Sequence, residues 1–162
     1  MAIVLGLNAT TLRNSEVAGS IADAIASSAN WKIVTNIRDE TLNMDTSLAD
    51  ITTRKAAGWR LQVGTLSEGS VDCNILYDTA DLDFQAFQTA FFAKSMILMA
   101  FYDVNPKTLG LGETSSGLKG GWSVTNFTIN RQLEEAMMVD VTFTVRDDDL
   151  GFGPSWDTIT GT

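Results

Sequence analysis

Regular alternation of apolar and polar residues constrains this chain more than any other feature of its sequence. In the segment Val139–Val145 every second residue is apolar, and successive side chains of a β-strand point to opposite faces. The segment Ser70–Tyr77 has the same pattern. Both segments are therefore predicted to be strands with one face in a core and one polar face. The polar residues that this places on the second face include Asp72, Asn74, Asp140, Thr142 and Thr144.

Strand composition recurs along the rest of the chain, interrupted by one stretch with helical spacing. The other predicted strands are Ile3–Leu12, Lys32–Met44, Trp59–Val63, Ser95–Val104 and Trp122–Ile129. The spacing of Phe84, Phe87 and Phe91 predicts a helix over Leu82–Lys94, with Asp81 or Asp83 as its N-cap. The chain is thus predicted to be mainly β, a β-sandwich or barrel with one flanking α-helix.

The whole chain, 1–162, is predicted to be a single domain that contains several irregular segments. An Ala/Ser-rich insertion covers 14–30, where a mobile loop and a short helix both fit the composition. A flexible loop is expected over 105–121, and a C-terminal arm over 146–162. The segment Asp45–Gly58 has few large side chains and is predicted to be mainly loop, and a bulge is expected near Asp39–Thr41.

The composition excludes the commonest kinds of active site. The chain has no histidine and one cysteine, so it has neither a Ser-His-Asp or Cys-His arrangement nor a histidine metal ligand. Cys73 lies in the apolar register of its strand and is predicted to be a buried structural thiol. We therefore expect no catalytic residues, no cofactor and no metal site, and the chain is predicted not to be an enzyme.

The charge and the hydropathy of the chain limit its partners. The formal net charge is −9, and an acidic surface repels phosphate, which disfavours ordinary nucleic-acid binding. The same charge suits a surface that DNA must pass without sticking. No apolar run is long enough to span a bilayer, and the N-terminus lacks the basic region of a signal peptide. Synthesis in the cytoplasm and no membrane insertion are expected.

Five segments in a fixed order resemble the major tail tube proteins of long-tailed (siphovirus-type) bacteriophages. They are TNIRDETLNM (Thr35–Met44), ADITTRKAAGWRLQVGTL (Ala49–Leu66), SVDCNILYDTAD (Ser70–Asp81), SVTNFTINRQLEEAMMVDVTF (Ser123–Phe143) and PSW (Pro154–Trp156). The chain departs from the family pattern in the insertion over 14–30, in the Gly-rich loop after Pro106, and at Gln132, where the family tends to have Pro. These departures concern loops and outer-surface decoration more than the fold.

The resemblance implies a structural virion protein. Such subunits assemble into hexameric rings that stack into a hollow tube, and DNA passes through the lumen without specific binding. The implied partners are other copies of the chain, a tail terminator, a tape measure protein and baseplate or tail-tip proteins. The implied location is the virion tail, after synthesis in the host cytoplasm. Strands that join across subunits into one barrel would also remove the exposed sheet edges of a single subunit.

Two surfaces follow as hypotheses. The polar residues Asp72, Asn74, Asp140, Thr142 and Thr144 are predicted to face the lumen, although a merely solvated outer face has the same pattern. A second set is predicted to contact a neighbouring subunit or ring, with Arg54 pairing a carboxylate of the neighbour. This contact set consists of Asp45, Asp50, Arg54, Lys55, Trp59, Phe152 and Trp156.

Two alternatives remain open at the level of sequence. One is a tube subunit of a contractile tail, a gene transfer agent or an injection device. The other is a monomeric β-sandwich that binds carbohydrate, with Trp59, Trp122 or Trp156 as a stacking platform.

Overall fold

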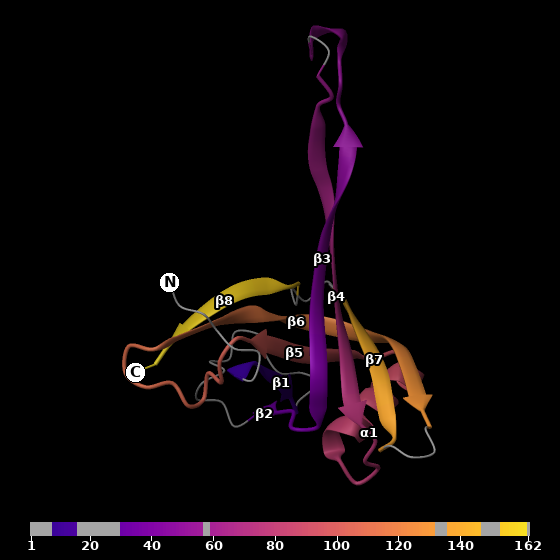
Figure 1. Cartoon of the computed structure of the whole chain (residues 1–162), viewed down its shortest axis with the longest axis vertical. Helices are drawn as coiled ribbons and strands as arrows, with labels where there is room; N and C mark the ends of the chain where they lie inside the picture. The colour runs from indigo at the N-terminus through magenta and orange to yellow at the C-terminus, as the bar shows by residue number, and fades with distance from the viewer. Residues whose placement is uncertain (1–7, 16–29, 57–58, 132–135, 147–152, 162) are drawn as a thin grey trace.

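The strands of the chain form one antiparallel sheet with a helix against one face (Figure 1). The computed structural model describes residues 8–15, 30–56, 59–131, 136–146 and 153–161. The strands are β1 (Thr10–Asn14), β2 (Trp31–Ile33), β3 (Ile37–Asp50), β4 (Gln62–Leu76), β5 (Met96–Tyr102), β6 (Thr114–Asn130), β7 (Met138–Val145) and β8 (Ser155–Thr160). The helix α1 spans Leu82–Ala93, and a 3-10 turn, η2, spans Arg54–Ala56.

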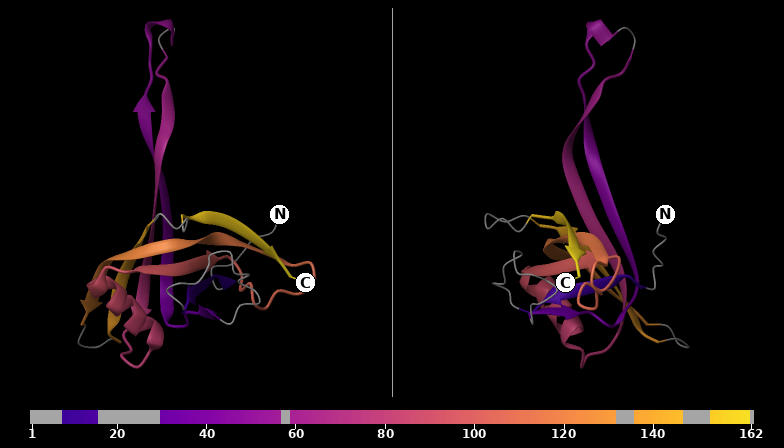
Figure 2. Two further views of the ribbon diagram at one scale, coloured as in Figure 1. Left: turned by 180° about the vertical axis from the view of Figure 1, so that it is seen from behind. Right: turned by 90° about the vertical axis from the view of Figure 1, so that its left-hand side faces the viewer.

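The sheet has the order β2-β1-β5-β6-β7-β4-β3. β6 is the long strand at its centre: β5 pairs with one edge, and β8 and β7 lie end to end along the other. The sheet is curved, and the pair β3–β4 extends far beyond it (Figure 2). The predicted mainly β fold with one flanking helix is confirmed, with a single sheet bent into part of a barrel.

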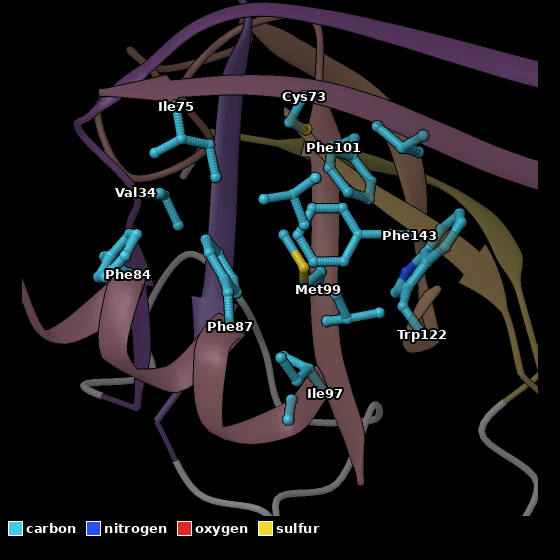
Figure 3. Close-up of a cluster of buried hydrophobic side chains, with 14 of the residues drawn as sticks. Val34, Cys73, Ile75, Phe84, Phe87, Ile97, Met99, Phe101, Trp122 and Phe143 are labelled. Atoms are coloured by element: carbon cyan, nitrogen blue, oxygen red, sulfur yellow. The ribbon is translucent and has the colours of Figure 1, made fainter. Parts of the chain in front are cut away.

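The core lies between α1 and the concave side of the sheet. Phe84 and Phe87 of α1 point toward the sheet, where the apolar residues of β4, β5, β6 and β7 meet them (Figure 3). Phe87 packs edge-on against Phe143, with ring centroids 5.1 Å apart. A smaller cluster covers the other face of β5 with Leu98, Ala100 and Tyr102. β5 is buried on both faces, which explains its uninterrupted apolar run.

The helix begins and ends where its sequence predicts. The Asp81 side chain accepts a hydrogen bond from the Asp83 backbone N–H at 3.0 Å, and it thereby satisfies an N–H of the first turn. Lys94 ends the helix in the left-handed conformation, with φ of 53°. Arg13 of β1 forms a largely buried ion pair with Asp83, with Nη2 and Oδ1 2.6 Å apart, which ties the helix to the sheet.

Two predicted loops are wrong in extent. Within the predicted loop over 105–121, strand β6 already begins at Thr114. Gly117 pairs with Tyr102 there, and a Cβ on it would lie 2.0 Å from the Phe101 carbonyl oxygen. The absence of a side chain at Gly117 therefore lets β5 and β6 approach each other closely. The predicted loop Asp45–Gly58 is also shorter, because β3 continues to Asp50.

Other predicted boundaries shift by smaller amounts. The segment Lys32–Met44 is broken between β2 and β3, and the predicted bulge lies between Ile37 and Asp39. The C-terminal arm forms β8 within its described part and pairs with β6. Most of the insertion over 14–30 lies outside the described residues. Among the described residues, no helix combines the length and the apolar character needed to cross a membrane.

Candidate functional site

A polar surface covers the face of β3, β4, β7 and β6 that points away from α1. Asp72 and Asn74 of β4 lie directly opposite Thr142 and Asp140 of β7, and Thr144 lies opposite Ser70. Their neighbours along each strand belong to the core, so these side chains project from the other side of the sheet. The structure therefore brings together all five residues that the sequence predicted to face a lumen. We call this surface the polar face: Asp39, Thr41, Asn43, Ser70, Asp72, Asn74, Ser123, Asn126, Thr128, Asn130, Asp140, Thr142 and Thr144.

Hydrogen bonds join the polar face across its strands. Asp140 accepts from Asn74 Nδ2 at 2.6 Å and from Asn130 Nδ2 at 2.5 Å. Asp72 accepts from Thr142 Oγ1 at 2.7 Å and from Asn43 Nδ2 at 3.1 Å. The two carboxylates are held by neutral donors, which fix the side chains in place and leave the negative charge uncompensated.

The chemistry of the polar face is electrostatic. Its three ionisable members, Asp39, Asp72 and Asp140, are all acidic, so the face repels phosphate and favours water and cations. Cys73 lies on the opposite side of the strand, where burial raises the pKa of its thiol well above the usual value. No group of three or more His, Cys, Asp or Glu residues suited to a metal ion occurs in the part of the chain that the structure describes.

A second surface is the hairpin that projects from the sheet. β7 covers β4 only from Ser70 onward, so the segment Gln62–Gly69 and its partner Met44–Asp50 extend alone. At about 3.3 Å per residue, this part is roughly 26 Å long. We call it the arm, and its loop (51–56 and 59–61) the arm tip. The arm and its tip carry large apolar side chains that no described residue covers: Leu48, Ile51, Trp59, Leu61, Val63 and Leu66.

Most residues predicted to make intersubunit contacts lie on the arm. Asp50 accepts hydrogen bonds from Thr52 and forms an ion pair with Arg60, with Nε and Oδ2 3.1 Å apart. Both partners lower the pKa of the Asp50 carboxyl, and Thr52 has the largest effect. Arg54, Lys55 and Trp59 are exposed on the arm tip, with Trp59 76% exposed. Asp45 lies in strand β3 opposite Glu68, which corrects its predicted loop position.

The two C-terminal members of the predicted contact set lie elsewhere. Trp156 is on β8 and is 64% exposed, whereas Phe152 lies outside the described residues.

Arg60 and the β6 members of the polar face were not predicted from the sequence. In β6, the register shift between Val124 and Asn126 interrupts the alternation of apolar and polar residues, so the sequence does not indicate which side of β6 is polar. The Thr125 hydroxyl at this shift forms a hydrogen bond with the Thr144 hydroxyl at 3.0 Å.

The tryptophans do not form a common binding platform. Trp122 is fully buried against Phe101, which contradicts its predicted role in stacking a sugar. The arm tip with Trp59 and the strand β8 with Trp156 lie far apart in both views of the molecule (Figures 1 and 2). Burial therefore excludes Trp122 as the stacking platform of the carbohydrate-binding alternative, whereas Trp59 and Trp156 are exposed but separate.

Two of the open strand edges of the sheet lie beside the polar face. Among the described residues, the outer edge of β3 has no strand partner, and β6 pairs only with β7 from Val124 to Asn130. Both edges border the polar face. An unpaired edge is a template for another strand, so the polar face can continue into a second copy of the chain.

The chain forms a curved antiparallel sheet with one helix against the side opposite the polar face and a long projecting hairpin. Its fold is similar to that of solved tail-tube structures, so the resemblance seen in the sequence is confirmed at the level of fold. The chain is similar to a subunit from the tail of an empty gene transfer agent particle with C6 symmetry (TM-score 0.65, 15% identity over 94% of this chain and 98% of that chain). It is also similar to the SPP1 tail tube protein (TM-score 0.70, 11% identity, 99% and 82%).

A third similar structure comes from the baseplate of the anti-feeding prophage (TM-score 0.57, 10% identity, 94% of this chain and 91% of that chain). No protein-family model and no curated protein sequence matches the chain.

Proposed function

We propose that this protein is the structural subunit of a hollow tail tube that conducts DNA out of a virion. The observation that carries the proposal is the polar face, a rigid and acidic surface with the hydrophobic core directly behind it. This is what a channel wall requires, because side chains that repel phosphate and stay hydrated let DNA pass without binding. The tail-tube fold supports the same function.

The open edges supply the route to a ring. When β3 of one copy pairs beside β6 of the next, the polar faces join into one continuous inner wall, and both of these strand edges gain a partner. Six copies per ring is the number we propose, following the C6 symmetry of the similar gene transfer agent tail. The exposed apolar arm then lies between stacked rings, where burial removes it from water.

The proposed partners are copies of the chain, together with a terminator, a tape measure protein and a baseplate or tail-tip protein at the ends of the tube. The tube of a gene transfer agent or of an injection device is the same function in another particle, and similar structures come from both kinds of assembly. Synthesis in a host cytoplasm before incorporation into the tail belongs to the same proposal.

Negative-stain microscopy and sedimentation of the purified protein test this function. The expected result is hollow rods or rings that increase with protein concentration. A protein that remains monomeric at every concentration would overturn the proposal. Sugar-dependent retention of such a monomer on carbohydrate resins would favour the binding-module alternative instead.

A further inference from the structure

Two exposed surfaces lie at opposite ends of the molecule's longest axis. The arm tip forms one end, and α1 with the loop before it forms the other, in every view (Figures 1 and 2). Copies that stack head to tail along this axis bring the arm tip of one onto the helix end of the next. This placement rests on the proposed tube function, and the chemistry of the two ends then decides whether they fit.

The arm tip combines apolar and cationic side chains. Ile51, Trp59 and Leu61 are all exposed. Arg54 and Lys55 of the turn η2 are also exposed, and neither makes an ion pair with any described residue, whereas the nearby Arg60 is already paired with Asp50. The tip therefore offers two free positive charges within an apolar surface.

The helix end has the complementary character. The only charged residue of α1 is Asp83, which is neutralised by Arg13. Leu82 and Phe92, on its outer side, are 68% and 74% exposed. A surface helix normally carries charged residues on its outer face, so this one is suited to being covered. Asp78 in the preceding loop is exposed and forms no ion pair within the described part of the chain.

A cleft beside the helix adds room for an inserted side chain. It has a volume of about 360 Å³ and lies between α1 and the strands β1 and β5. Leu82, Gln85 and Thr89 of α1 form one wall, and Arg13, Met96 and Leu98 contribute to the others. We call Asp78, the exposed side of α1 and this cleft the helix pole.

We propose that the arm tip of one copy docks on the helix pole of a copy in the next ring. Ile51 and Trp59 cover Leu82 and Phe92, and Arg54 and Lys55 face Asp78. The contact joins two different surfaces of the same chain, so it propagates in one direction and gives the tube a polarity. Apolar burial supplies the attraction, and the charges select the orientation.

Cross-linking between two single-cysteine variants tests the contact. Ile51→Cys and Phe92→Cys subunits are mixed, assembled and treated with a short bismaleimide, while native Cys73 is 3% exposed and unreactive. Covalent dimers are expected from the mixture and not from either variant alone. The matched control pairs Ile51→Cys with Thr158→Cys, an exposed position on β8. Tubes that cross-link through Thr158 and not through Phe92 would overturn the docking.

Charge exchange gives a second, independent readout. Asp78→Lys, and separately the pair Arg54→Glu with Lys55→Glu, should reduce stacking by more than about tenfold, because the loss repeats at every contact between rings. The triple variant should restore stacking. Rings should form in all cases, since the strand edges are untouched. Unchanged stacking in both variants would refute the docking alone, whereas monomers in the unaltered protein would refute the tube function as well.

Discussion

At the scale of single residues, one glycine decides how β5 and β6 pack. A Cβ at Gly117 would lie 2.0 Å from the Phe101 carbonyl oxygen and 2.8 Å from Tyr102 Cα, both of them backbone atoms held in a ladder. Gly117→Ala must therefore push the strands apart. We expect a loss of about 3 kcal/mol in the free energy of unfolding, measured by urea denaturation.

The control for this prediction is Gly64→Ala on the arm. The nearest atom to a Cβ there is the Thr46 methyl carbon at 3.1 Å, which belongs to an exposed side chain with freedom to shift. This substitution should cost less than about 1 kcal/mol. Equal losses for the two variants would show that close strand contact does not determine the cost.

A second residue, Glu40, makes the stability of the subunit depend on pH. Glu40 pairs with Cys73 in the register of β3 and β4, and burial raises the pKa of its carboxyl above 4.5 even though the Thr11 hydroxyl donates a hydrogen bond to it. The folded state then holds this proton more tightly than the unfolded state. The contribution of Glu40 to stability must therefore fall as pH rises from about 4.5 through the raised pKa.

Glu40→Gln removes this titration. Relative to the natural protein, the variant should gain stability as the pH rises above about 4.5, and urea denaturation at several pH values measures the difference. Asp39→Asn is the control, because Asp39 is an exposed neighbour with an 81% exposed side chain. A stability difference between Glu40→Gln and the natural protein that is the same at all pH values would contradict the account.

At the scale of elements, an ion pair fixes the helix to the sheet. Arg13 and Asp83 are 12% and 13% exposed, and Arg13 Nε also donates to Asp83 Oδ1 at 2.7 Å. Asp83→Ala leaves a largely buried guanidinium without its partner and should lower the free energy of unfolding by about 3 kcal/mol. Arg13→Met combined with Asp83→Leu should cost less than the sum of the two single changes. Additive losses in denaturation experiments would mean that the residues do not act as a pair.

The elements also show what the sequence predicted and why. Segments with one buried and one solvent-exposed face, such as β7, have a regular alternation of apolar and polar residues, and they were predicted correctly as strands. Five residues of the polar face were predicted together with them. The helix was found because Phe84 and Phe87 lie on one side of it. These successes share a cause, since burial on one face imposes a period.

The arm and the start of β6 were missed for the opposite reason. Both faces of the arm are exposed, so no period marks Asp45–Asp50 as strand, and its Asp, Thr and Ser residues suggest a loop. In β6, the glycines at 117, 120 and 121 suggest flexibility, although Gly117 permits close strand packing. The ion pair between Asp50 and Arg60 depends on the hairpin register and has no local signal in the sequence.

At the scale of the whole molecule, the polar face is the surface that we propose lines a channel. The five short polar residues on β4 and β7, the open edges of β3 and β6 and the uncovered arm all follow if the subunit is one segment of a tube wall. A single copy leaves each of these features unexplained, because exposed edges and apolar side chains are liabilities in a monomer.

Cryo-electron microscopy of the assembled protein tests this claim most directly. We predict a hollow tube with six subunits per ring, in which Asp72 and Asp140 face the lumen and β3 of one subunit lies beside β6 of the next. A reconstruction that places Asp72 and Asp140 on the outer wall, with the channel lined by other residues, would contradict the account.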